Sequence, residues 1–191
     1  MAREAQQGRP GNAGQGRDGF WKKIWNIDCP PKIKHFLWRL NHNTLAVRRV
    51  LQKRGMKLDT RCCLCGRLDE DGGHLLLKCK EVKPVWRELN MEDIRCSLAE
   101  AESAKAMMEK VLKLQHSKQL TVVFLLWIWW DERNKKREEG RRRTAQEVVY
   151  ITAAMADRLK QQPVRSLLSD SRQAKQWEKP CSDTAALAGR P

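Results

Sequence analysis

Four side chains able to bind zinc are spaced through one short segment, and this spacing restricts the local fold more than any other feature of the chain. The pattern is Cys62-x2-Cys65-x8-His74-x4-Cys79, within eighteen residues. Zinc prefers a tetrahedron of nitrogen and sulfur donors, with Zn–S distances of about 2.3 Å. A Cys-x2-Cys turn directs two thiolates to one side of the ion, and the His-x4-Cys pair supplies donors from the other. We predict one structural Zn2+ ion with no open coordination position.

The first ligand is open between two neighbouring cysteines. Only one residue separates Cys63 from Cys65, which is a less common ligand spacing, so Cys62 is preferred and Cys63 is predicted to be a packing residue. The segment 69–73, between the ligand pairs, has a composition typical of a solvated, conformationally permissive loop. Three cysteines have no metal-binding neighbours and are left out of the site: Cys29, Cys96 and Cys181.

Hydrophobic periodicity predicts helices next to the cysteine segment. Pro31 suits a first helical turn, and the residues after it place four apolar side chains on one helical face, namely Ile33, Phe36, Leu37 and Leu40. A second helix is expected behind Thr44 as its N-cap, ending before Gly55. The cysteine segment is expected to form a turn or short ribbon, followed by a helix from near His74.

Three further helices are predicted in the second half of the chain. Ser97-Leu-Ala-Glu100 matches a capping box, with apolar residues at helical spacing behind it. Residues 119–135 have the composition of a buried helix that becomes basic at its end. Thr144-Ala-Gln-Glu147 is a second capping box, opening a helix that Pro163 should end.

These patterns predict a mainly α fold, with a small helical domain that contains a zinc-bound loop or ribbon. Residues 1–19 have no apolar periodicity and are predicted to be a disordered leader, and the polar residues 163–191 a disordered tail. Between them we expect a zinc-binding domain over 20–90 and a helical extension over 91–162.

The charge of the chain indicates a polyanionic partner. The formal net charge is +15 and the pI is about 9.8, values typical of proteins that displace counterions from nucleic-acid phosphates. We expect RNA or single-stranded DNA as the partner, although a solvated helix face explains any single basic residue as well. The candidate phosphate contacts are Lys32, Lys34, Arg39, Arg48, Arg49, Arg54, Lys135, Lys136 and Arg137.

The cysteines and the hydropathy of the chain indicate in which cellular compartment it resides. Seven cysteines, an odd and clustered number, with no signal peptide argue against a secreted disulfide scaffold. The longest apolar run, 122–130, has nine residues, whereas a membrane span needs about 20. We expect an intracellular protein of the nucleus or cytoplasm. Its tryptophans could stack on bases, but we expect them mainly to be core: Trp21, Trp25, Trp38, Trp86, Trp127, Trp129 and Trp130.

Several motifs in order resemble the zinc-binding domain that follows the reverse transcriptase in plant non-LTR (LINE-type) retrotransposon polyproteins. The resemblance covers residues 20–87, with weaker similarity to about 135. It includes a Trp-x3-Trp start, a Pro-Lys-x-Lys-x-Phe-x-Trp segment, the Cys-x2-Cys-Gly turn, the His-Leu-x3-Cys segment with a later tryptophan, and a Trp-x-Ile-Trp-x3-Arg-Asn-like segment. The residues that match are Trp21, Trp25, Pro31, Lys32, Lys34, Phe36, Trp38, Cys62, Cys65, Gly66, His74, Leu75, Cys79, Trp86, Trp127, Trp129 or Trp130, Arg133 and Asn134.

The resemblance implies a non-catalytic module, because the carboxylates of the neighbouring enzymes are missing. There is no Asp-Asp pair for a polymerase, and the one tyrosine, Tyr150, has no carboxylate nearby. A ribonuclease H domain needs several separated carboxylates on an α/β core. Two alternatives to nucleic-acid binding stay open: a zinc-stabilised structural or protein-interaction domain, and a non-functional fragment of a retroelement.

Overall fold

The computed structural model describes residues 15–160, with side chains described from Phe20 onward. This part of the chain is mainly helical, as the sequence predicted, and within it the only strand-like pairing is an isolated bridge between Arg61 and Asp69. The helices are α1 (Gln15–Trp25), α2 (Pro31–Asn41), α3 (Arg48–Lys53), the π-helix η1 (His74–Lys78), α4 (Lys83–Glu88), α5 (Glu92–Ala99), α6 (Ala104–Leu112), α7 (His116–Glu139) and α8 (Ala145–Lys160).

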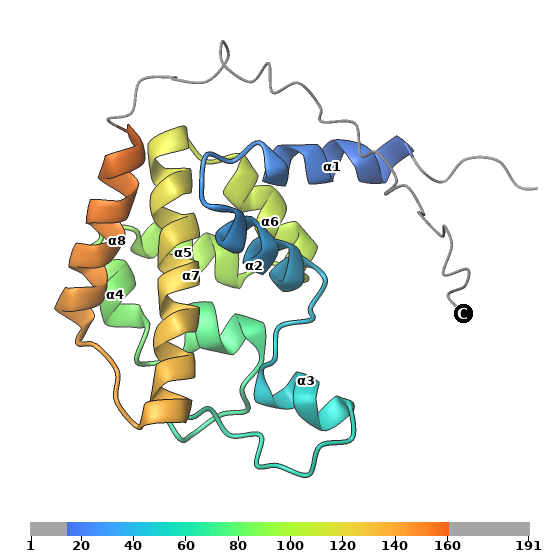
Figure 1. The fold of residues 1–191 in the computed structure, drawn as a ribbon, viewed down its shortest axis with the longest axis vertical. Coiled ribbons are helices and arrows are strands. Elements are labelled where there is room, and N and C mark those ends of the chain that lie inside the picture. Colours follow the sequence, from blue (N-terminus) through green and yellow to red (C-terminus); the bar gives the residue numbers. More distant parts are fainter. Residues whose placement is uncertain (1–14, 161–191) are drawn as a thin grey trace, which may run out of the picture. The chain divides into compact units, whose positions relative to one another are not determined.

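The long helix α7 forms the centre of the arrangement (Figure 1). It packs against α8 on one side and against α2 and α6 on the other, while η1 also contacts it. Residues 120–126 of α7 are all buried, since the helix is covered on several sides. The prediction of a buried helix over 119–135 is confirmed. None of the helices in residues 15–160 combines the length and apolar character needed to cross a bilayer.

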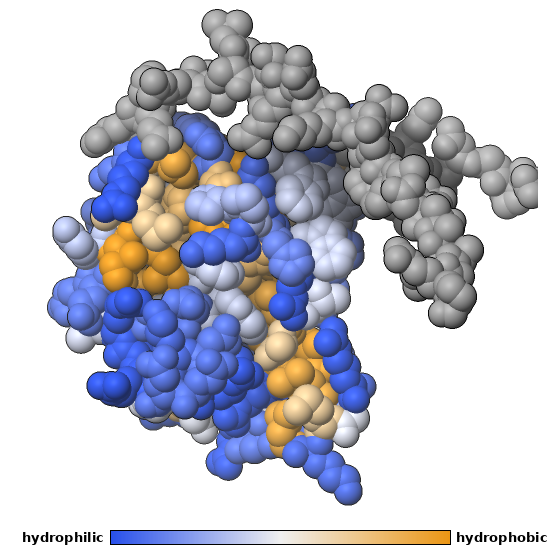
Figure 2. Space-filling model, viewed as in Figure 1, coloured by the Kyte–Doolittle hydropathy of each residue, from blue (hydrophilic) through white to orange (hydrophobic). Residues whose placement is uncertain are grey.

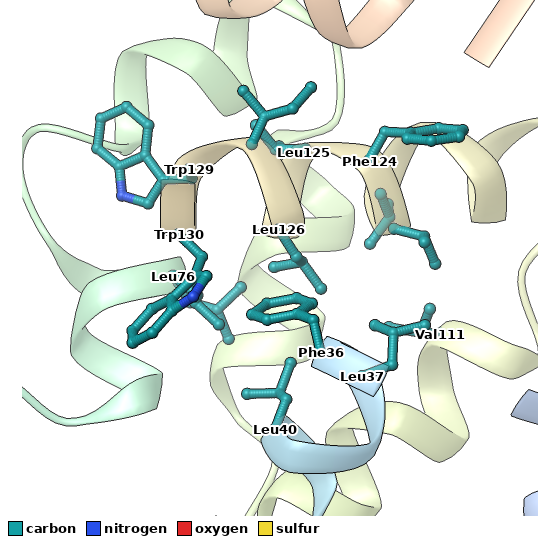
Figure 3. Packing of buried hydrophobic residues seen from close by; sticks show 14 of the residues in the cluster. Phe36, Leu37, Leu40, Leu76, Val111, Phe124, Leu125, Leu126, Trp129 and Trp130 are labelled. Atoms are coloured by element: carbon teal, nitrogen blue, oxygen red, sulfur yellow. The ribbon is translucent and has the colours of Figure 1, made fainter. Parts of the chain in front are cut away.

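The core joins the segment around the cysteines to the later helices. The four predicted residues of the α2 face are all buried, and Figure 3 shows Phe36, Leu37 and Leu40 directed toward Leu126 of α7 and Val111 of α6. The Phe36 ring lies 5.5 Å from that of Trp127, edge to face. The predicted zinc-binding and helical segments therefore share one hydrophobic core.

Two of the predicted helix starts are wrong. Thr44 caps no helix, because its hydroxyl donates to Arg39 O at 3.1 Å, and α3 begins only at Arg48 behind Val47. Ser97 lies inside α5 rather than before a helix. The N-cap of the next helix is Ser103, whose hydroxyl accepts from the Ala106 N–H at 3.1 Å.

Other predicted boundaries hold. Gly55 follows the end of α3 with φ of +90°, a conformation that glycine adopts without strain. The Thr144–Glu147 box forms in both directions at the start of α8. By contrast, the predicted disorder of residues 15–19 is wrong, because helix α1 already begins at Gln15, in a Gly-containing stretch without apolar spacing. Residues 1–14, the predicted tail at 163–191 and Pro163 lie outside the described residues.

Candidate metal centre

The four predicted zinc ligands converge between the loop after α3 and the start of η1. The donor atoms of Cys62, Cys65, His74 and Cys79 all lie within 4.8 Å of one another, and Cys65 Sγ is 3.4 Å from His74 Nε2. The ligands of a tetrahedral zinc ion are separated by roughly 3.5–3.8 Å, given its bond lengths. Three sulfurs and one imidazole nitrogen form a soft donor set that suits zinc. These residues therefore fit a Zn2+ ion.

The first ligand pair lies on a tight turn. The Gly66 N–H donates to Cys62 O at 2.8 Å, and Gly66 has a φ of +67° that favours glycine. The Cys62 N–H donates to Leu68 O at 2.7 Å, which closes the short ribbon expected from the sequence. The backbone N–H groups of Leu64 and Cys65 donate to Cys62 Sγ, so the turn directs positive dipoles at the first ligand.

The electrostatics of the cluster favour a cation. A hydrogen bond from the Cys79 thiol, together with the backbone donors, lowers the pKa of Cys62. The same contact, followed by burial, raises the pKa of Cys79 well above its usual range. A divalent cation bound between the two sulfurs would take the place of this hydrogen bond and offset the negative charge of both thiolates.

The second ligand pair is held by the π-helix η1. The Cys79 N–H donates to His74 O at 2.7 Å, an i to i+5 bond that is one residue longer than the α-helical bond. The predicted start near His74 is correct, but the turn is wider than an α-helix. The His74 N–H itself donates to Asp71 Oδ1 at 2.7 Å, so the loop before η1 positions this ligand.

Side chains from three other helices donate hydrogen bonds to the carbonyls of η1. Trp129 Nε1 donates to Leu75 O at 3.0 Å, and Trp86 Nε1 donates to Leu76 O, also at 3.0 Å. The buried Arg95 donates from Nη1 to Leu77 O at 2.7 Å. A short helix leaves its last carbonyls without intrahelical partners. These donors of α7, α4 and α5 therefore hold the turn that carries the second ligand pair.

Glu70 contradicts the prediction of a solvated loop between the ligand pairs. It is fully buried and forms an ion pair with the fully buried Arg133 of α7. Its carboxylate also accepts from the Arg48 N–H at 3.1 Å and from Cys63 Sγ at 3.5 Å. Cys63 thus lies outside the ligand cluster, as predicted. Charge-assisted bonds satisfy both buried ions, and they join the metal loop to α3 and α7.

Sequence reasoning did not identify the roles of Glu70 and Arg95. A signal existed for the Glu70 pair, because Arg133 follows a buried apolar run, and a buried guanidinium needs an anionic partner. Nothing local identified that partner among the acidic residues of the loop. The donation from Arg95 to η1 has no comparable signal, since it depends on how α5 packs.

The candidate phosphate contacts on α2 each have a neighbour within the chain. Lys32 Nζ lies 5.8 Å from the centre of the Trp127 ring. Lys34 Nζ donates to Trp25 O at 2.7 Å, and Arg39 donates to a backbone carbonyl at 3.3 Å. Lys32 is exposed, whereas Lys34 and Arg39 are half-buried.

The candidates on and after α3 are more accessible. Arg48 is half-buried, and its Nη1 donates to Asp59 O at 3.1 Å. Arg49 is exposed and lies 3.7 Å from Asp71, a distance for a weak surface pair. Arg54 is exposed as the C-cap of α3. Arg49 and Arg54 therefore lie at the surface.

The basic candidates near the end of α7 have acidic or backbone partners. Lys135 forms a 2.6 Å ion pair with Asp131, and Arg137 forms a 2.7 Å pair with Glu138. Lys136 Nζ donates to a backbone carbonyl at 2.7 Å. Figure 2 shows a broad hydrophilic surface over this part of α7 and the start of α8, at the lower left of the view.

The tryptophans divide into buried and exposed groups. Trp86, Trp129 and Trp130 are buried as predicted, and Trp21 and Trp127 are half-buried. The prediction of core positions is wrong for Trp25 and Trp38, which are 48% and 38% exposed. Both lie on the solvent side of their helices.

Part of the chain matches a known protein family. Residues 9–86 match the family described as zinc-binding in reverse transcriptase, a span that contains all four candidate ligands. No curated protein and no solved structure matches the chain.

Proposed function

Since residues 9–86 match the family described as zinc-binding in reverse transcriptase, we propose that this chain is a non-catalytic, zinc-stabilised module that binds RNA or single-stranded DNA. One Zn2+ ion would be held by Cys62, Cys65, His74 and Cys79. The observation that carries the proposal is this closed four-donor cluster within a chain of net charge +15.

The metal would have a structural role. Four protein donors fill a tetrahedron and leave no position for a water molecule or substrate. When bound, the ion supplies folding free energy, because the ligands are not assembled in the unfolded chain. Its ligands link the loop after α3 to η1, so the surface of α3 would depend on the metal for its position.

Nucleic-acid binding would use basic side chains that remain accessible. Arg49 and Arg54, on and just after α3, and Lys32 on α2 are exposed cations. Such residues contact phosphates and position a nucleic acid without reading its sequence. The paired residues Lys135 and Arg137 would contribute less, since their carboxylate partners already offset their charge.

The test is a binding titration of the full zinc-loaded chain with fluorescent single-stranded RNA and DNA over a salt series. We expect log affinity to fall linearly with log salt, with a slope of about −0.7 for each phosphate neutralised. The double variant Arg49→Gln, Arg54→Gln should flatten this slope. Arg158→Gln, an exposed change on α8, is the matched control and should leave it unchanged. Absence of binding at low salt would reject the proposal.

A protein-interaction role is the second candidate, and one feature favours it. Met56 and Leu68 are 52% and 60% exposed in the loop on either side of the first ligand pair. Methionine is enriched at interfaces with other proteins. Under this alternative, Met56→Ser and Leu68→Ser leave nucleic-acid affinity unchanged and disrupt association with a protein partner.

A further inference from the structure

Five aromatic rings form a continuous row across α1 and the outer face of α2. Trp21 stacks on His42 with centroids 4.7 Å apart and planes at 3°, and the Trp38 ring lies 4.4 Å from that of His42 with planes at 43°. His35 is stacked against Trp38 at 6.0 Å, and Phe20 meets Trp21 edge to face at 5.4 Å. We call these five side chains the aromatic row. His35, Trp38 and His42 are all exposed, so the row presents ring surface to solvent.

The row is held by its own hydrogen bonding and helical spacing. Positions 35, 38 and 42 are separated by three and four residues, which places them on one helical face. The His42 Nδ1–H donates to Trp38 O at 2.9 Å, which fixes the imidazole at the end of α2. The opposite face of α2 is buried in the core. Packing of the helix therefore does not account for the exposed rings.

A groove of about 510 Å3 begins at His42, the middle ring of this row. It is lined by the end of α2, by α3, by the loop at 71–73 and by the start of α6, and His42 belongs both to the row and to the groove wall. Four cations line it: Arg49, Lys53, Lys78 and Lys105. Two carboxylates, Asp71 and Glu102, also line it. We call this feature the basic groove.

We propose that the aromatic row and the basic groove form one continuous binding surface for single-stranded RNA. Bases would stack on Trp38 and the neighbouring rings, while the sugar–phosphate backbone follows the cations of the groove. This inference rests on the proposed function and deepens it, because it assigns the ligand class and the path. Aromatic platforms beside a cationic groove are a general means of holding unpaired strands.

The strand must be unpaired because a ring can stack only on a base whose face is free. A duplex presents phosphates and groove edges instead, and these contact cations without involving the aromatic row. RNA is favoured over DNA by the polar lining of the groove. A carboxylate such as Glu102 repels phosphate but accepts a hydrogen bond from a ribose 2′-hydroxyl, which DNA lacks.

The experiment measures the affinity of the full zinc-loaded chain for a single-stranded RNA, the DNA of the same sequence and an abasic RNA backbone of equal length. Trp38→Ala should weaken RNA binding about tenfold, as expected for loss of one stacked base, and leave binding of the abasic strand unchanged. Trp25→Ala is the matched control, because Trp25 is exposed but lies outside the row; it should have little effect. The double variant Lys53→Gln, Lys105→Gln should make the slope of log affinity against log salt less steep, by the contribution of about two phosphate contacts.

The outcomes separate this inference from the function on which it rests. If the chain binds RNA but Trp38→Ala behaves like Trp25→Ala, the surface is assigned wrongly, although nucleic-acid binding stands. Tighter binding of the DNA than of the RNA overturns the choice of RNA. Failure of the unmodified chain to bind any strand rejects both proposals. Cross-linking of 4-thiouridine RNA gives an independent readout without a mutation. Cross-linked peptides should come from residues 20–53, 71–78 and 98–107, and peptides from α8 alone would contradict the path.

Discussion

Glu70 and Arg133 form a fully buried ion pair although 63 residues separate them in the chain. Arg133 Nε donates to Glu70 Oε2 at 3.2 Å, and its Nη2 contacts the other carboxylate oxygen. The guanidinium also lies 5.1 Å from the centre of the Trp130 ring. Because Glu70 accepts from the Arg48 N–H as well, one carboxylate joins the metal loop to two helices.

The pair should be strongly coupled in stability measurements. Removing one partner leaves a buried charge without compensation, which typically costs about 3–5 kcal/mol. We expect Arg133→Met alone to lower the free energy of unfolding in urea by this amount. The double variant Glu70→Gln, Arg133→Met should lose less than the sum of the two single losses.

A surface pair provides the control for this cycle. Asp157 and Lys160 form an i, i+3 ion pair at 2.9 Å on α8, with their side chains partly exposed. Asp157→Asn should change the free energy of unfolding by no more than about 0.5 kcal/mol. Additive losses at Glu70 and Arg133 would show that the two charges do not stabilise each other.

Neighbouring cysteines should respond differently to the same substitution. Cys65→Ser removes a sulfur of the four-donor cluster, so we expect loss of stoichiometric zinc and unfolding of the segment around 60–87. Cys63→Ser removes only a thiol that donates to Glu70, and it should retain one zinc per chain. Zinc measured by mass spectrometry, together with thermal unfolding, checks both. Full zinc in Cys65→Ser would contradict the ligand set.

The two indole N–H groups that donate to η1 should stabilise the fold by more than the packing of their rings alone. Trp129→Phe and Trp86→Phe each leave a buried carbonyl without its donor, which adds about 1–3 kcal/mol to the loss of packing. Trp127→Phe makes the same change in volume at a half-buried position that packs edge to face on Phe36. Urea unfolding should therefore rank Trp127→Phe as the mildest of the three. Losses at Trp129 and Trp86 no greater than the change in buried ring volume would assign the effect to packing alone.

The start of α8 should depend on pH through Glu147. The Thr144 N–H, and then its hydroxyl, lower the pKa of this carboxyl below its ordinary value of 4.5. A lowered pKa means that the carboxylate stabilises the fold fully above about pH 4.5, and that this contribution is lost as pH falls through the folded-state value. Glu147→Gln should unfold at a lower temperature than the unmodified chain at neutral pH. The difference between the two melting temperatures should shrink on acidification. A difference independent of pH would exclude the charge as its cause.

The sequence was sufficient where structure depends on local spacing. The apolar positions of α2 all became buried because a 3.6-residue period leaves few alternatives for Ile33, Phe36, Leu37 and Leu40. The box at Thr144 and Glu147 formed because both partners lie within one turn. The convergence of the four zinc-ligand side chains likewise follows from short intervals along the chain.

Features that depend on distant partners could not be predicted in this way. Ser97 matched a capping pattern, but Leu98 and Arg95 are buried and keep that segment inside α5. Glu70 looks like its acidic neighbours in sequence, and only the position of Arg133 distinguishes it. The exposure of Trp38 depends on which face of α2 meets α7. Its large aromatic side chain led to the prediction that it is buried.

The π-helical turn has a consequence for the insertions and deletions that this chain can tolerate. Losing one leucine between His74 and Cys79 would close an ordinary α-helical turn and rotate the sulfur by about 100° around the helix axis. It would also shift the carbonyls that receive Trp129, Trp86 and Arg95. A change of length within the three leucines that follow His74 should therefore disrupt both the metal site and the hydrogen bonds that hold η1 to α4, α5 and α7.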